Sequence, residues 1–473
     1  MTQQSILERG RIRGQRSGGN AVVLGGSMAG LLAARVLADF FDQVTLIERD
    51  ALPKGAENRK GVPQGRHLHA LLTRGEQILS RLFPGLPDEL EQGGATRCDI
   101  PGDVLWYQYG GYKLRFESGI TVLSMSRPFL EYAVRRRVLA IENLRRIDQC
   151  EVRDLIATPD RSRVTGVKVQ RRESQEELID ADLVVDATGR GSHSPKWLEA
   201  LGYSRPEETA VEVGVGYTTR IYRQRPGCLE GAKAVFTMPT PPRETRGGVL
   251  FPMEGDRWIV TLAGWLGDHA PAEEKGFLEF ARSFAALDIH NVISRAEPIT
   301  DFVTHKLPSN LRRHYEKMKR FPSGYLVTGD AICSFNPVYG QGMTVSAMEA
   351  EALEECLRIA IAGNSLDSIA PAFFRKAAKA VDHAWTMAVG EDLRYPQVEG
   401  PRPSGTNLIN WYLEQVHRAT LRDREISRVF FNIMTMTHSP SEIFKPAAMV
   451  RVLRGRLRQP AASNAGHTVA VRG

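Results

Sequence analysis

A glycine-rich turn near the start of the chain, between a short apolar strand and a helix, constrains the fold more than any other feature. Residues 21–24 read Ala-Val-Val-Leu, a fully apolar run typical of a strand buried in a parallel sheet. Gly-Gly-Ser-Met-Ala-Gly follows at 25–30, a helical pattern runs on from Met28, and a second apolar strand at 44–47 leads to Glu48. Strand, glycine turn, helix, strand and acid in this order predict a βαβ unit that binds a dinucleotide.

Each position of the turn has a physical reason to lie against a dinucleotide. Gly25 permits the tight turn, and Gly30 lets the helix pack closely on the strand. Ser27 stands where the backbone approaches a pyrophosphate and where glycine is usual, and its hydroxyl could itself donate to a phosphate. Met28 and Ala29 open the helix, whose N-terminal amides and partial positive charge attract the anion.

The acid at the end of the second strand indicates how a nucleotide would be held. Glu48 can accept hydrogen bonds from the ribose hydroxyls of an adenosine. Arg49 beside it could instead contact a 2′-phosphate, but the acid in the strand-end position argues against that. These residues do not distinguish FAD from NAD.

The composition is that of a globular protein of ordinary polarity. The 473 residues are 42% hydrophobic and 25% charged, and the net charge of +7 is spread along the chain rather than gathered in a nucleic-acid stripe. No apolar run approaches the ~20 residues of a membrane-spanning helix, and the basic N-terminal segment lacks the apolar stretch of a secretory signal. Five cysteines stand far apart without a CxxC pair. We therefore expect a reduced, cytoplasmic protein with no nucleic-acid partner and no transmembrane segment.

Patterns further along the chain predict an α/β protein with two interleaved domains. Strands at 183–185 and 325–328 and a long helix at 342–362 extend the Rossmann-type dinucleotide-binding domain. Alternating residues at 104–126 and 211–265 predict an antiparallel sheet that would form a substrate-binding domain. The expected boundaries are 1–18 for a disordered basic arm, 19–100, 126–200 and 300–363 for the discontinuous nucleotide-binding domain, 101–125 and 201–299 for the sheet domain, 364–458 for a C-terminal helical region and 459–473 for a disordered tail.

A later segment carries a specific resemblance to a known family. Residues 325–331 form a strand that ends in Gly-Asp-Ala, and residues 334–343 read Ser-Phe-Asn-Pro-Val-Tyr-Gly-Gln-Gly-Met before a helix. With Asp-Ala-Thr-Gly at 186–189 and Ser-Arg-Pro at 126–128, these segments resemble the class A FAD-dependent monooxygenases.

The resemblance implies that the cofactor is FAD and assigns further contacts to it. Asp330 would lie on the ribityl chain or the pyrophosphate, Pro337 close to the reactive edge of the flavin, and Arg127 within reach of a phosphate or the flavin. The amides at the start of the late helix would face the pyrimidine side of the ring and stabilise the anionic reduced flavin. The cofactor contacts implied in that helix start are Gly340, Gln341, Gly342 and Met343.

A loop in the first domain narrows the resemblance. Residues 59–69 read Arg-Lys-Gly-Val-Pro-Gln-Gly-Arg-His-Leu-His, which looks like the bacterial flavin epoxidases that act on polyene chains in polyether biosynthesis. Squalene epoxidases carry a similar Pro/Gln-rich loop. Because the loop passes over the isoalloxazine in that family, Gln64 is implied as a flavin neighbour, Arg66 could face a phosphate, and Arg59 joins the implied cofactor contacts.

The function implied is that of an FAD-dependent monooxygenase that inserts one oxygen atom from O2 through a flavin hydroperoxide, epoxidising an olefin of a large apolar polyketide or terpenoid in secondary metabolite biosynthesis. Electrons would come from NAD(P)H directly or through a flavin or ferredoxin-type reductase, since no second glycine fingerprint is present. An aromatic hydroxylase, an isoprenoid-type reductase and a flavin-containing non-redox cyclase stay open as alternatives. Halogenases carry a Trp-x-Trp-x-Ile-Pro signature, and the six tryptophans here include no pair two positions apart.

Aromatic residues of the expected sheet suit a large apolar substrate. His67 and His69 could ligate a metal, but no third ligand is suitably spaced, so we expect structural roles and no metal site. The sequence does not assign a catalytic base, and Pro337 and Gln64 are the flavin-adjacent residues nearest to the chemistry. The expected substrate-pocket residues are Tyr109, Tyr217, Phe236, Phe251 and Trp265.

Overall fold

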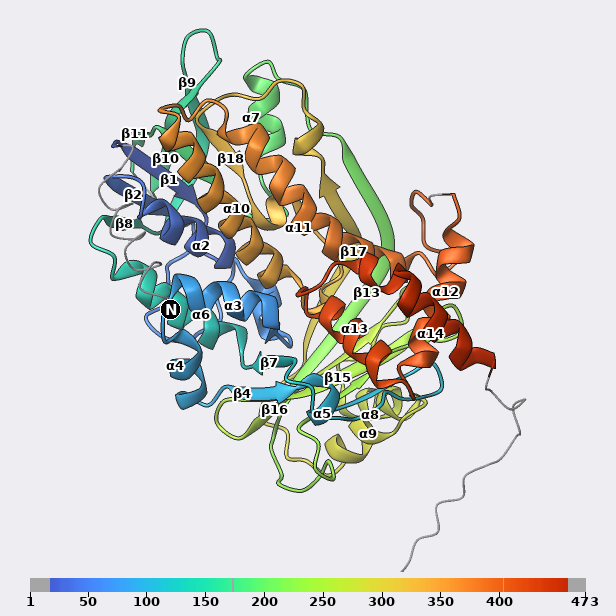
Figure 1. The fold of residues 1–473 in the computed structure, drawn as a ribbon. Helices are drawn as coiled ribbons and strands as arrows, with labels where there is room; N and C mark the ends of the chain where they lie inside the picture. Colours follow the sequence, from blue (N-terminus) through green and yellow to red (C-terminus); the bar gives the residue numbers. More distant parts are fainter. Residues whose placement is uncertain (1–17, 172–173, 403, 458–473) are drawn as a thin grey trace, which may run out of the picture.

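The computed structural model describes residues 18–171, 174–402 and 404–457 (Figure 1). The tail expected at 459–473 lies outside the described residues, as does the arm expected at 1–18 except for Gly18. One part of the molecule is built on a five-stranded parallel sheet, as expected for a Rossmann-type domain. In spatial order its strands are β18 (Tyr325–Val327), β12 (Leu183–Asp186), β1 (Asn20–Leu24), β2 (Gln43–Ile47) and β8 (Leu144–Ile147).

The parallel sheet brings distant parts of the chain to one edge. Because β1, β2, β12 and β18 run in the same direction, the residues that follow them meet where their carboxyl ends lie. These residues are Gly25, Glu48, Ala187 and Thr328. Ligands of open parallel sheets bind at this edge, so the topology alone predicts where a nucleotide would lie.

A mixed sheet of eight strands forms the second part. All its pairs are antiparallel except β14 with β5, which is parallel. Strand β17 pairs with β13 in this sheet, so residues 303–313, which were expected in the nucleotide-binding domain, pair into the large sheet. In spatial order the strands are β19 (Cys333–Ser334), β17 (Val303–Arg313), β13 (Glu208–Arg223), β16 (Arg257–Gly264), β15 (Arg246–Met253), β14 (Ala234–Thr237), β5 (Val104–Gln108) and β6 (Gly111–Tyr112).

Strand β17 also ties the two parts together. The Arg190 guanidinium donates to the carbonyl oxygen of Ser309 at 2.8 Å. Arg313 donates to the carbonyl oxygens of Ala331 at 3.0 Å and Arg190 at 3.1 Å. Both arginines therefore join the eight-stranded sheet to loops that follow strands of the parallel sheet.

Two three-stranded sheets complete the β structure. Strand β7 (Thr121–Ser124) was expected in the substrate sheet but pairs with β3 and β4, since the chain leaves the large sheet after β6. The other small sheet has the order β11-β10-β9. The remaining strands are β3 (Ala70–Leu71), β4 (Thr96–Asp99), β9 (Cys150–Ala157), β10 (Val164–Arg171) and β11 (Glu176–Asp180).

Helices cover the parallel sheet (Figure 1). Two short helices between residues 274 and 293 pack on one face of the eight-stranded sheet, and the C-terminal helices pack on the other. Phe430 and Phe431 of α13 pack edge-on against Trp106 of β5, with ring centroids 6.0 and 5.4 Å away, so the C-terminal helices share a core with the large sheet. The α-helices are α2 (Met28–Leu37), α3 (Thr73–Leu82), α4 (Leu86–Gln92), α5 (Ile100–Asp103), α6 (Arg127–Leu139), α7 (Ser194–Ala200), α8 (Glu274–Arg282), α9 (Asp288–Ile293), α10 (Gly342–Ala362), α11 (Ile369–Asp392), α12 (Thr406–Ala419), α13 (Arg424–Met434) and α14 (Pro446–Leu457).

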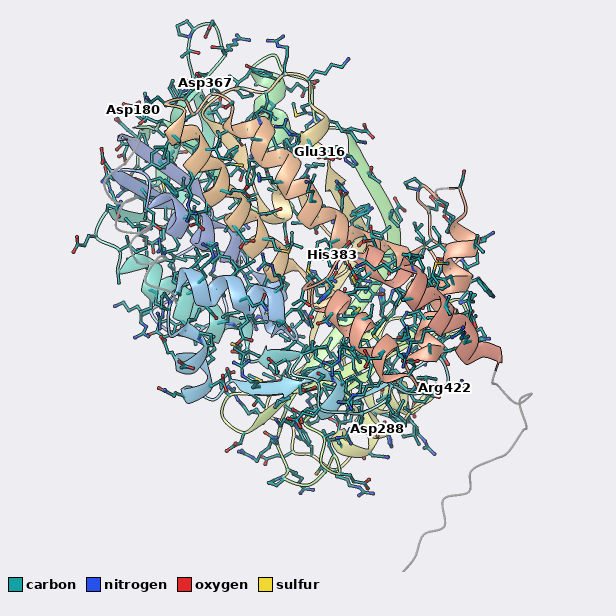
Figure 2. The ribbon with its side chains drawn as sticks, viewed as in Figure 1. Asp180, Asp288, Glu316, Asp367, His383 and Arg422 are labelled. Atoms are coloured by element: carbon teal, nitrogen blue, oxygen red, sulfur yellow. The ribbon has the colours of Figure 1, made fainter. Side chains whose placement is uncertain are left out.

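Charged side chains are spread over the surface. Figure 2 shows Asp180 and Asp367 at one end of the molecule and Asp288 and Arg422 at the other. In the part of the chain that the structure describes, no helix is both long and apolar enough to span a bilayer.

Candidate active site

The turn after β1 is built so that only glycine fits at two positions. Gly25 has a φ of +98°, and a Cβ on it would lie 2.6 Å from the carbonyl oxygen of Ala187. A Cβ on Gly30 would lie 1.8 Å from the carbonyl oxygen of Gly25. The backbones of β1, α2 and the residue after β12 therefore approach one another more closely than a side chain permits.

Helix α2 starts at the edge of the parallel sheet. Ser27 is its N-cap residue, yet its side chain makes no capping hydrogen bond, so the first amides of the helix stay available to an anion. Ala29 is partly exposed there. Met28 is 2% exposed and belongs to the hydrophobic core, so of this residue only the backbone can serve a cofactor.

Glu48 is fixed by its neighbours immediately after β2. Its Oε2 accepts a hydrogen bond from the Gly26 amide at 2.7 Å and forms an ion pair with Arg59 at 3.0 Å. Its Oε1 accepts from the Asp50 amide at 3.0 Å and keeps a lone pair for a further donor such as a ribose hydroxyl. Arg49 is exposed at the rim.

A buried chain of charges links this acid to the glycine turn. Ser27 Oγ donates to Glu131 at 3.1 Å and accepts from Arg127 at 3.0 Å, while Arg59 Nε donates to Glu131 at 3.1 Å. Burial alone would raise the pKa of Glu131, but Arg127 and Arg59 outweigh it and hold this pKa below its ordinary value. Sequence reasoning missed Glu131, although an acid four residues after Arg127 on a helix was a usable signal.

The two arginines keep donors for a further ligand. Arg59 Nη2 and Arg127 Nε are buried without a hydrogen-bond partner among the described residues. Arg59 lines a cavity of about 410 Å³, which we call the polar groove. Arg127 does not line it but donates a hydrogen bond to Ser27, which does. The sequence-predicted residues that line the polar groove are Gly25, Ser27, Glu48, Arg49, Arg59, Gln64, Asp330 and Pro337.

The second half of the predicted flavin site is a loop between β18 and α10. Gly340 has a φ of +67°, and a Cβ on Gly340 or on Gly342 would meet no atom within 4 Å, so a planar group has room beside both. Helix α10 starts at Gly342 without a side-chain cap. Gln341 and Met343 point into the protein, with Gln341 Nε2 against the sulfur of Met387 and Met343 in the core, so of these two residues only the backbone amides are suitably placed.

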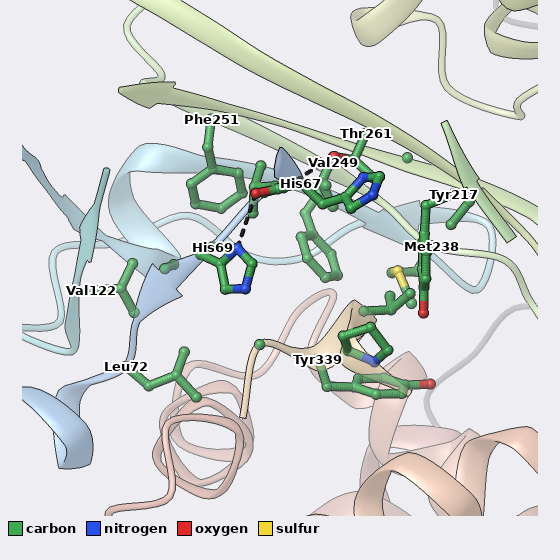
Figure 3. Close-up of a pocket in the computed structure, with 18 of the residues that line it drawn as sticks. His67, His69, Leu72, Val122, Tyr217, Met238, Val249, Phe251, Thr261 and Tyr339 are labelled. Atoms are coloured by element: carbon green, nitrogen blue, oxygen red, sulfur yellow. Dashed lines mark hydrogen bonds between the residues drawn. The ribbon is translucent and has the colours of Figure 1, made fainter. Parts of the chain in front are cut away.

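An apolar cavity of about 110 Å³ lies between the eight-stranded sheet and the C-terminal helices (Figure 3). Tyr217, Phe236 and Phe251 line it, as expected. Tyr109 and Trp265 do not, which corrects their expected place in the pocket. The Tyr109 ring stacks on His417 with 4.5 Å between centroids, and the Trp265 indole donates to Asp392 at 3.0 Å.

The polar groove and the apolar cavity meet. Gln64, His305 and Pro337 line both, and Gly340 lines the apolar cavity. Arg66, predicted to face a phosphate, is exposed and lines neither. A flavin bound in the groove would therefore have its ring at the junction, next to the apolar cavity.

Three histidines lie in the wall of the apolar cavity, where the sequence had suggested only structural roles for two of them. His67 Nδ1 is 2.7 Å from the hydroxyl of Thr219, and burial, followed by His305, lowers the His67 pKa to about 4. Burial also lowers the pKa of His305. Burial, followed by Arg127, lowers the pKa of His69 to about 3. The cavity therefore holds neutral imidazoles near neutral pH.

A buried polar network supports the junction from the protein side. The Tyr217 hydroxyl donates to Asn336 at 2.8 Å, directly before Pro337, and Asn336 Nδ2 donates to Asp392 at 3.1 Å. Asn310 Nδ2 donates to the other oxygen of Asp392 at 2.9 Å. Burial raises the pKa of Asp392 to about 6. Sequence reasoning missed this network because its members come from four separate elements.

Within the described ranges, no group of three or more His, Cys, Asp or Glu side chains is placed to hold a metal ion.

Comparison with known proteins shows a relative and the fold. Protein Rv3254 of Mycobacterium tuberculosis (strain ATCC 25618 / H37Rv) is 36% identical over 387 residues, 79% of this chain and 80% of that protein. The flavin-dependent brominase Bmp2 superimposes with a TM-score of 0.64 at 13% identity, over 93% of this chain and 99% of its own. PqsL of Pseudomonas aeruginosa, a probable FAD-dependent monooxygenase, gives a TM-score of 0.58 at 15% identity, over 88% of this chain and 100% of its own. No protein-family model matches the chain. The fold is that of flavin-dependent monooxygenases and halogenases.

Proposed function

The chain belongs to the same family as Protein Rv3254 of Mycobacterium tuberculosis, and from this premise and its fold we propose that it is an FAD-dependent monooxygenase acting on an apolar substrate. The observation that carries the proposal is the junction of the polar groove with the apolar cavity at Gln64, His305 and Pro337. A cofactor with a polar dinucleotide tail and a reactive ring would reach from one into the other.

The residues of the groove fit FAD. Gly340 and Gly342 leave space that a Cβ would fill, and the α2 and α10 N-termini offer uncapped amides. In this proposal the α2 amides, Arg59 and Arg127 bind the pyrophosphate, and Glu48 accepts from the ribose diol. When bound and reduced, FAD would supply two electrons to molecular oxygen, so that one oxygen atom passes to the substrate and the other leaves as water. The amides at the start of α10 would stabilise negative charge on the reduced ring.

The apolar cavity supports an olefin as the reacting group. Its lining of aromatic and aliphatic side chains excludes water from the reaction. An olefin needs no side-chain base to accept oxygen, whereas a phenol must be deprotonated. Since His67 and His69 have pKa values of about 4 and 3, they are weak bases for a phenol. We therefore favour epoxidation of an olefin in a polyketide or terpenoid over aromatic hydroxylation.

The electron supply and the rival reactions define the rest of the proposal. Electrons would come from NAD(P)H, directly or through a flavin or ferredoxin-type reductase. The fold is shared with a brominase, but the chain lacks the Trp-x-Trp-x-Ile-Pro signature expected of halogenases. An isoprenoid-type reductase would saturate its substrate anaerobically, and a non-redox cyclase would act without flavin reduction.

The test measures where the oxygen goes. The purified protein is assayed for bound FAD, reduced without oxygen, and mixed with isotopically labelled O2 and a panel of polyenes that includes squalene and farnesol. We expect label in an epoxide and a matching fall in hydrogen peroxide release. Peroxide as the sole product with every polyene, or a preparation that binds no FAD, would contradict the proposal. Bromide added to a parallel reaction would reveal a halogenase by a brominated product.

A further inference from the structure

His69 presents a free lone pair inside the apolar cavity. Its Nδ1 lies 3.0 Å from the carbonyl oxygen of His67, and a carbonyl oxygen can only accept a hydrogen bond. Nδ1 therefore carries the proton, and in the neutral ring Nε2 is an acceptor. Figure 3 shows the His69 ring projecting into the cavity among Leu72, Val122 and Tyr339.

Three other polar side chains of the wall are already engaged. The Tyr217 hydroxyl donates to Asn336, the Thr261 hydroxyl lies 2.7 Å from that of Thr219, and the Thr435 hydroxyl donates to the Phe431 carbonyl at 2.9 Å. Nε2 of His69 has no hydrogen-bond partner among the described residues. It is not one of their buried unpartnered atoms, which include His67 Nε2 and Trp106 Nε1 of the same wall. A purely apolar ligand has no hydrogen-bond donor to offer this lone pair. Such a ligand would bury the acceptor without a partner, which costs binding free energy.

We propose that His69 Nε2 accepts a hydrogen bond from a hydroxyl group of the substrate, so that the substrate is an apolar molecule bearing a hydroxyl. The inference rests on the proposed function, because it takes the apolar cavity to be the substrate site. It names a class of substrate, hydroxylated olefins, and makes His69 a specificity-determining residue.

His69 holds the hydroxyl rather than deprotonating it. Burial, followed by Arg127, keeps the His69 pKa at about 3, far below that of any alcohol or phenol. The hydrogen bond would instead fix one end of an otherwise featureless chain. Because Gln64 and Pro337 line the same cavity at the junction, a fixed hydroxyl sets which olefin of the chain faces them.

The experiment compares three ligands that differ at one group: farnesol, its methyl ether and β-farnesene. Their binding to the purified full-length protein, with FAD content measured, is followed by isothermal titration calorimetry, which needs no turnover. We expect farnesol to bind about fivefold to tenfold more tightly than the other two, the worth of one hydrogen bond. His69→Phe should bring the three affinities together, and His69→Gln, which keeps an acceptor, should retain part of the preference.

Val122→Ala is the matched control in the same wall. It should weaken the binding of all three ligands alike and leave the ratios of their affinities unchanged, because Val122 offers packing without a hydrogen bond. Equal affinities of wild-type protein for farnesol and the ether, a preference that survives in His69→Phe, or no binding of any of the three would overturn the inference. If the protein prefers farnesol but labelled oxygen never enters a product, the role of His69 is supported and the oxygenase proposal is contradicted.

Discussion

The polar groove and the apolar cavity meet at three residues but are built in opposite ways. The groove depends on glycines that admit no Cβ, on helix N-termini, and on charged side chains that pair with one another. The cavity is formed by side chains from the eight-stranded sheet and the helices packed on it. Close backbone packing and paired charges tolerate few substitutions, whereas an apolar wall can be altered one residue at a time.

The difference separates what the fold requires from what selects a substrate. A change in the groove should act on folding or on cofactor affinity and affect every substrate equally. A change in the cavity wall should leave the cofactor in place and alter the choice among substrates. Four substitutions test this division, from the largest expected effect to the smallest.

Gly30→Ala should have the largest effect. The added Cβ would lie 1.8 Å from the Gly25 carbonyl oxygen, so β1 and α2 must separate. We expect the free energy of unfolding to fall by about 4 kcal/mol or more, with loss of bound flavin. Urea denaturation followed by circular dichroism measures it. Gly390→Ala in α11, where a Cβ meets nothing within 4 Å, is the control and should be neutral or stabilising. A Gly30→Ala protein as stable as wild type would refute the close packing.

Glu349→Gln should remove a pH dependence of the protein's stability that arises beneath the groove. Glu349 accepts from the Thr328 hydroxyl and the Gly329 amide, and burial raises its pKa to about 7. A pKa raised in the folded state means that the folded protein binds this proton more tightly. Stability should therefore fall as pH rises from about 4.5 to about 7, by about 3 kcal/mol.

Denaturation curves across this pH range provide the measurement for Glu349. The Gln variant, which mimics the protonated acid, should lose this slope. Glu355→Gln, on the exposed side of the same helix, should keep it. A wild-type protein whose stability rises through the window would contradict the assignment.

Glu48→Gln should weaken the binding of the cofactor without unfolding the protein. It removes the charge that Arg59 pairs with and the strongest acceptor available to a ribose hydroxyl. We expect FAD affinity to fall about tenfold to a hundredfold, measured by flavin fluorescence on titration. Glu151→Gln, an exposed acid in the lining of the same groove, should leave the affinity unchanged. Equal losses in both variants would mean that net charge, rather than the position of Glu48, holds the cofactor.

Phe251→Leu should have the smallest effect on the fold and act on substrate size. It enlarges the apolar cavity at an expected stability loss of about 1 kcal/mol and should leave FAD affinity unchanged. Competition between short and long polyenes in one reaction measures the size preference. Phe284→Leu, in a separate core cluster, should match the stability loss without altering that preference. If Phe251→Leu releases flavin instead, the division between groove and cavity fails.

The groove was predictable from the sequence because its key residues lie close together along the chain. Gly25, Gly30 and Glu48 follow from one strand–helix–strand unit, and the parallel sheet that the unit implies is confirmed. Glu131 was missed because its role depends on Arg59 from a distant segment as well as on Arg127 of its own helix.

The cavity was predictable only where strand alternation holds. Tyr217, Phe236 and Phe251 lie within β13, β14 and β15, where successive side chains alternate between faces. Tyr109 and Trp265 each follow the last residue of a strand, and Tyr109 has a φ of +56°, so alternation no longer fixes the direction of their side chains. That Nε2 of His69 is a free acceptor could not be predicted from the sequence. The hydrogen bond between Nδ1 and the His67 carbonyl oxygen decides which ring nitrogen is free.

The arginine contacts of strand β17 affect how a substrate can enter the apolar cavity. Arg190 and Arg313 fasten the large sheet to the loops around the parallel sheet through carbonyl oxygens of Ser309, Ala331 and Arg190 itself. A hinge opening between the two parts of the protein would break all of these hydrogen bonds at once. Traffic into the apolar cavity should therefore depend on small local excursions, such as those of the short helical turn Pro63–Arg66 that carries Gln64, while the two halves move as one body.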